Sequence, residues 1–167
     1  MIADRRAARW DRARTKPSTV ADRVRDGRPT VQTGEMVHES IHVSTTIDRP
    51  AGEVYDYASN PVNLSNWAAG LAHEEVRLVD GQWVAQSPMG RVVVAFAPAN
   101  EFGVLDHDVT LPSGETVRNP MRVIPNGDGC DVVFTVHRRP GVSEADFAAD
   151  VEAVTRDLAV LRGQLEG

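Results

Sequence analysis

The chain has 167 residues and 41% hydrophobic residues, which suits one domain with a substantial core and leaves little room for two. No run of 18 or more apolar residues occurs and the first residues are charged, so the sequence predicts neither a membrane-spanning helix nor an export signal. The single cysteine excludes an internal disulfide and a CxxC zinc or redox pair, which favours a cytoplasmic location.

Charge divides the chain unevenly. The first 30 residues carry nine Arg or Lys against four Asp, a net charge of +5, which leaves −11 for the rest. Few apolar side chains occur in 1–35, so we predict a basic, largely disordered tail there and one domain in 36–167. The tail also suits an arm for nucleic acid or an acidic membrane, or an extension from a misassigned start ahead of Met36. The acidic domain argues against nucleic acid as its own partner.

The domain is predicted to open with one strand and two short helices. From 38 to 48, apolar and polar side chains alternate with period two, which is typical of a half-buried strand. Pro50 then begins a helix, because proline is tolerated in the first turn. The pair Asn60-Pro61 begins a second helix that runs to about Trp67.

Five or six further strands are predicted, separated by turns rich in Gly, Pro, Asn and Asp. Their connections are short enough for hairpins, which predicts an antiparallel sheet. These strands cover residues 73–80, 83–87, 92–97, 102–111, 116–124 and 130–138.

A long amphipathic helix is predicted at the C-terminal end. Ser143 is its expected N-cap, with Asp146 three residues later in the place where a capping box usually has Glu or Gln. One apolar stripe follows at steps of four and three: Phe147, Val151, Val154, Leu158, Leu161 and Leu165. An antiparallel meander and such a helix bury each other only if the sheet curls around the helix, so the predicted class is α+β.

Three stretches resemble a known superfamily. IDRPAGEVYDYASNPVNLSNWAAGL, residues 47–71, is similar to the usual opening of the SRPBCC superfamily, which includes START lipid-binding domains and the pollen-allergen fold. FGVLDHDVTLPSGETV and MRVIPNGDGCDVVFTV resemble later strands of bacterial, polyketide cyclase-like members. The resemblance covers residues 37–165. It implies a helix-grip fold, in which a curved antiparallel sheet of about seven strands wraps around the long helix, with two short helices after the first strand.

The same resemblance implies an apolar ligand cavity between the concave face of the sheet and the last helix. Strand alternation then predicts which side chains reach that cavity. His107 falls on the inward face of its strand, and Asn119 falls inward on the neighbouring strand as a second polar group. The predicted ligand-binding residues are Trp67, Trp83, Met89, Phe96, Leu105, His107, Asn119, Met121, Phe147, Val151 and Val154.

His107 admits two interpretations. It is a candidate catalytic acid or base, or a donor to a ligand carbonyl, because imidazole titrates near neutral pH. Alternatively it is a core-edge histidine bonded to Asn119, a backbone group or water. Asp106 and Asp108 cannot orient it, because adjacent strand residues point to opposite faces. His38 and His42 share a face but lie about 13 Å apart, too far to chelate one metal.

Three functions therefore remain open from the sequence. The first is binding of a small apolar or aromatic ligand, lipid-like or polyketide-like, in the cavity. The second is an enzyme of the polyketide cyclase or dehydratase kind that uses His107, and the third is a protein-interaction module without a ligand. No metal or nucleotide motif is present in the sequence, so no cofactor is predicted, and membrane insertion is not expected.

Overall fold

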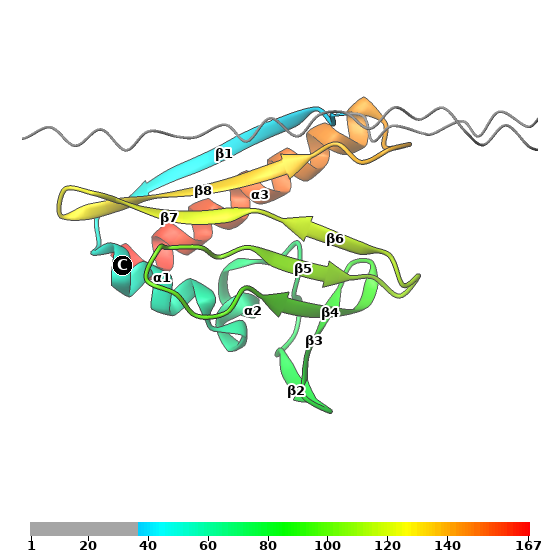
Figure 1. Ribbon diagram of the computed structural model, residues 1–167, viewed down its shortest axis with the longest axis horizontal. Coiled ribbons are helices and arrows are strands. Elements are labelled where there is room, and N and C mark those ends of the chain that lie inside the picture. Colours follow the sequence, from blue (N-terminus) through cyan, green and yellow to red (C-terminus); the bar gives the residue numbers. More distant parts are fainter. Residues whose placement is uncertain (1–36) are drawn as a thin grey trace, which may run out of the picture. The chain divides into compact units, whose positions relative to one another are not determined.

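The computed structural model describes residues 37–167, so the tail predicted for residues 1–35 lies outside the described part. The fold is α+β, with antiparallel strands and a long C-terminal helix, as predicted (Figure 1). The elements in chain order are β1 (Ser40–Ile47), α1 (Ala51–Ser59), the 3₁₀ turn η1 (Pro61–Asn63), α2 (Leu64–Trp67), β2 (Arg77–Val79), β3 (Gln82–Ser87), β4 (Gly90–Phe96), β5 (His107–Thr110), β6 (Thr116–Asn119), β7 (Met121–Asn126), β8 (Gly129–His137) and α3 (Glu144–Glu166).

The strands form two antiparallel sheets that meet at Pro120. One sheet has the order β1-β8-β7, and the other runs β2-β3-β4-β5-β6. Only Pro120 separates β6 from β7, because proline has no N–H to continue the ladder. The residue pattern predicts one strand at 116–124. If β6 and β7 are counted as one interrupted strand, the sheets together have the predicted number of about seven strands.

Pairing continues past Pro120 outside the regular strands. Leu105 N–H donates to the Met121 carbonyl at 2.9 Å, and Val123 N–H donates to the Gly103 carbonyl at 2.9 Å. Gly103 has a positive φ of 69°, and a Cβ there would lie 2.1 Å from the Val123 carbonyl oxygen. A glycine is therefore required where the β4–β5 connection crosses onto β7.

The first strand shows why alternation predicts the core. β1 pairs with β8 from Ser40 opposite His137 to Ile47 opposite Cys130. Val43 and Ile47 are buried on the helix side, while Ser44 and Thr46, at the alternate positions, are exposed on the outer face. Cys130 is fully buried, so its thiol packs in the core.

α3 buries the stripe that the sequence predicts. The Ser143 hydroxyl accepts from Asp146 N–H at 3.1 Å and donates to the Asp146 carboxylate at 2.7 Å, so the cap is a side-chain variant of the capping box. Phe147, Leu158 and Leu161 are buried in the core. The helix packs against β1 and α2 and lies behind β7 and β8 in Figure 1.

Asp157 ties α3 to the loop that follows α2. Its carboxylate accepts from Gly70 N–H at 3.3 Å, next to the C-terminal end of α2. Burial raises the pKa of Asp157 to about 6, although backbone hydrogen bonds from Gly70 and Ala69 oppose that increase. The carboxylate of Asp157 thus holds this loop, although burial disfavours its charged form.

Candidate functional site

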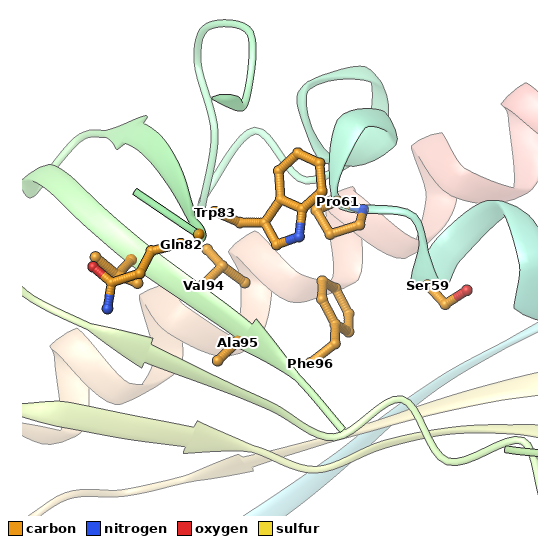
Figure 2. A pocket seen from close by; sticks show the side chains of 9 residues that line it. Ser59, Pro61, Gln82, Trp83, Val94, Ala95 and Phe96 are labelled. Atoms are coloured by element: carbon orange, nitrogen blue, oxygen red, sulfur yellow. The ribbon is translucent and has the colours of Figure 1, made fainter. Parts of the chain in front are cut away.

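A pocket of about 360 Å³ lies between the β3–β4 hairpin and the connection from α1 to η1 (Figure 2). Trp83 is paired with Val94 across the hairpin, and Phe96 follows two residues later on the same face. Figure 2 shows the indole of Trp83 beside Pro61 and the ring of Phe96 facing the same space. We call this space the aromatic pocket. It is lined by Ser59, Pro61, Gly81, Gln82, Trp83, Val93, Val94, Ala95 and Phe96.

Local sequence explains both walls of the aromatic pocket. The turn Asp80-Gly81 has positive φ at both residues, which folds β2 back onto β3 and presents Trp83. Opposite it, the Asn60 side chain accepts from Val62 N–H at 3.2 Å and fixes the start of η1. Pro61 therefore stands at a defined place against the indole.

The nine apolar residues among the predicted ligand-binding residues fall into three groups. Trp83 and Phe96 line the aromatic pocket. Six others are buried or half-buried in or against the core and are not lining residues of this pocket: Trp67, Leu105, Met121, Phe147, Val151 and Val154. Met89 is 52% exposed, because it lies in the two-residue turn where Ser87 pairs with Gly90. The expectation that Met89 lines the cavity is therefore corrected, since its turn carries it away from the inner face.

His107 is buried between two aromatic rings. Only 4% of it is exposed, and its ring centroid lies 5.0 Å from that of Phe96 and 5.9 Å from that of Phe134. Its Nδ1 lies 3.1 Å from the Leu105 carbonyl oxygen. Burial lowers the pKa of His107, although the Leu105 carbonyl and the charges of Asp106 and Asp108 oppose that decrease. Burial therefore favours the neutral form of the imidazole.

Asn119 lies directly opposite His107 in the pairing of β5 with β6. Opposite residues of an antiparallel pair share a face, so the predicted common side is in place. Within residues 37–167, however, no hydrogen bond joins the two side chains. The nearest fixed partner of the imidazole is the backbone.

Asp106 points to the opposite face from His107, as alternation predicts. Its carboxylate accepts from Arg122 and from Met121 N–H, the latter at 2.9 Å. Burial tends to raise the pKa of Asp106, but these hydrogen bonds and the positive charges of Arg122 and Arg118 outweigh it and lower the pKa. Asp106 therefore makes no carboxylate–imidazole dyad.

Sequence reasoning missed Ser59, Pro61 and Phe134. The Asn60-Pro61 helix start was recognised, but nothing in the pattern placed it against β3. Phe134 lies opposite Met121 in the pairing of β7 with β8. Knowledge of that register would have placed Phe134 beside His107.

Trp67 carries an unpaired polar atom. Its residue is 4% exposed, and the indole Nε1 has no hydrogen-bond partner in the described part of the chain. A buried donor without a partner costs about 1–3 kcal/mol, so groups of this kind are rare in folded proteins.

In the part of the chain that the structure describes, no group of three His, Cys, Asp or Glu side chains is arranged to hold a metal. None of the helices described there is long and apolar enough to cross a membrane.

Comparison with known protein families identifies the family of this domain. The family model described as polyketide cyclase / dehydrase and lipid transport matches residues 38–166. The chain belongs to this family. No curated protein matches the sequence closely enough to count as a relative.

Solved structures show the same fold at low sequence identity. An uncharacterised protein from Bacillus thuringiensis superposes with a TM-score of 0.61 at 11% identity, over 77% of this chain and all of that one. A START superfamily protein from Mycobacterium smegmatis gives 0.58 at 14% identity, over 76% of this chain and 97% of its own. A protein of the dynemicin biosynthetic locus superposes with a TM-score of 0.58 at 12% identity. The match covers 76% of this chain and 47% of that protein.

Proposed function

We propose that this domain binds a small apolar or aromatic molecule in the aromatic pocket. This pocket has no lining residue from α3, so the proposed site differs from the cavity expected between the sheet and that helix. The observation that carries this proposal is that two aromatic side chains, Trp83 and Phe96, line one space of about 360 Å³. Sites for small molecules are typically concave, of this size class, and lined by aromatic side chains with a few polar groups. Membership of a family described by lipid transport and polyketide chemistry supports the same class of ligand.

The test uses N-phenyl-1-naphthylamine, an uncharged aromatic probe that fluoresces when it leaves water. Removing the indole in Trp83→Ala should weaken binding roughly tenfold, because several tens of Å² of apolar contact are lost at about 25 cal/mol per Å². Met89→Ala is the matched control, since it also removes an apolar side chain from the same hairpin but outside the pocket. Equal affinity of both variants and the wild type would contradict this site.

His107 supports a second candidate, an enzyme of the cyclase or dehydratase kind. Because Nδ1 bonds to the Leu105 carbonyl, Nε2 carries the lone pair and is the possible base. It would take a proton from the carbon next to a ligand carbonyl. The resulting carbanion would form a carbon–carbon bond to a second carbonyl, and the proton would return to the alkoxide. We rank binding first, because the lowered pKa weakens this base.

The two candidates separate on one variant. If His107 is the base, His107→Ala abolishes turnover of a poly-β-ketone substrate while the probe still binds. Turnover that survives the substitution would rule out this role. Binding without any measurable reaction in the wild type would leave the domain as a ligand carrier.

A further inference from the structure

The hydrogen bond of His107 fixes which chemistry its free nitrogen can recognise. A carbonyl oxygen only accepts, so at 3.1 Å from the Leu105 oxygen Nδ1 must carry the hydrogen. The neutral ring then presents Nε2 as an acceptor, and no residue of the described range donates to it. In this tautomer the neutral imidazole has no N–H free for a ligand carbonyl.

Asp106 explains why the Leu105 carbonyl is available. Leu105 and Met121 make only one of the two backbone hydrogen bonds of a regular antiparallel pair, from Leu105 N–H to the Met121 oxygen. The other donor, Met121 N–H, turns instead to the Asp106 carboxylate at 2.9 Å. The Leu105 oxygen is left to accept from His107.

Phe96 connects the imidazole to the aromatic pocket. Its ring lines the pocket and also lies 5.0 Å, centroid to centroid, from the His107 ring. Phe96 is half-buried and packs against the core. A ligand in the pocket would have to turn this ring to another rotamer to reach the imidazole, because His107 is not itself a lining residue of the pocket.

We propose that the ligand carries a hydroxyl group, phenolic or enolic, which donates to His107 Nε2 while its apolar ring occupies the aromatic pocket. This inference rests on the proposed binding function and specifies the ligand class. A hydroxyl is favoured over a carbonyl or ether oxygen, because those groups have no hydrogen to give to a lone pair. The Trp67 Nε1–H group is a donor and would instead favour a ligand that carries an acceptor oxygen. The test therefore includes a ligand with an acceptor and no donor.

Three naphthalenes of matched shape separate these chemistries in isothermal titration of the full chain. 2-Naphthol offers a donor and an acceptor, 2-methoxynaphthalene offers only an acceptor, and 2-methylnaphthalene offers neither. The wild type should bind 2-naphthol about tenfold more tightly than the other two, as expected for one buried hydrogen bond. In ¹⁵N spectra, only 2-naphthol should shift the Nε2 signal of His107.

Two variants test the residue itself. His107→Asn keeps an amide at the place of Nδ1 but has nothing at the place of Nε2, so the preference for 2-naphthol should disappear. His107→Gln places an amide oxygen near the position of Nε2 and should retain most of it. The wild-type comparison stands even if a variant fails to fold.

The outcomes distinguish this inference from the function on which it rests. Equal binding of all three compounds, lost in Trp83→Ala, would keep the aromatic pocket as the site and overturn the hydroxyl inference. Equal binding of 2-naphthol and 2-methoxynaphthalene would also overturn it, in favour of a donor such as Trp67. Failure of all three to bind the wild type would overturn both.

Discussion

Replacing Asp157 with Asn is expected to stabilise the domain at pH 8 and to have much less effect at pH 4. The raised pKa of about 6, against an ordinary value of 3.8, means that folding disfavours the ionised carboxylate. Above pH 6 the folded state bears the full cost of that charge. As the pH falls from about 7 to about 4, the folded protein takes up the proton first and the cost disappears. Asn keeps an oxygen for Gly70 N–H and carries no charge at any pH.

The size of the effect follows from the two pKa values. A tenfold change in the acid constant corresponds to about 1.36 kcal/mol, so the difference between about 6 and 3.8 gives roughly 3 kcal/mol as an upper bound. The carboxylate retains contact with water, and screening by solvent reduces this to about 1–2 kcal/mol.

Urea unfolding at pH 8, 6 and 4.5 measures this effect directly. The free energy of unfolding of Asp157→Asn should exceed that of the wild type at pH 8, and the two should approach each other as the pH falls. Asp150→Asn, an exposed site on the same helix, is the control and should show no such trend. A variant that is less stable than the wild type by the same amount at every pH would refute the reasoning, because the hydrogen bonds would then outweigh the cost of burial.

Two further predictions concern the β4–β5 connection, where it pairs with β7. Gly103→Ala should lower the free energy of unfolding by about 3 kcal/mol or more in urea, since its Cβ would lie 2.1 Å from the Val123 oxygen; a change under 1 kcal/mol would mean that the loop moves freely. Asp106→Ala should release Met121 N–H to the carbonyl that binds His107, and ¹⁵N spectra should show loss of the single Nδ1–H tautomer. An unchanged imidazole spectrum would show that Asp106 does not position the ring.

Alternation and turn chemistry predicted the faces of the strands well. His107 is buried and Asp106 lies on the opposite face, as period two requires. The stripe on α3 is also where its steps of four and three place it. These features depend on neighbouring residues only, so a single sequence contains them.

The position of the pocket could not be predicted in the same way. Alternation tells which face a side chain is on, but not whether it packs against another side chain or borders a space. Leu105, Met121 and Phe147 are inward-facing and belong to the core, whereas Trp83 and Phe96 border the pocket. That difference depends on where η1 meets β3, which no local pattern specifies.

The hydrogen bonding of His107 was equally hidden. It depends on Pro120 interrupting the strand and on the Asp106 carboxylate taking a backbone donor from Met121. Both residues are visible in the sequence, but their effect appears only when the register of the β4–β5 connection against β7 is known. A register is a long-range property of the sheet.

The most direct test of the central claim is to map 2-naphthol onto the domain by ¹⁵N chemical-shift changes. The largest changes should fall on the Trp83 indole N–H and on the backbone amides of Val94 and Phe96, and the Nε2 signal of His107 should move in parallel. Ile124, exposed on the outer face of β7, should be unaffected. Changes centred on that outer face, with Trp83 unmoved at saturation, would contradict the claim that the aromatic pocket is the binding site.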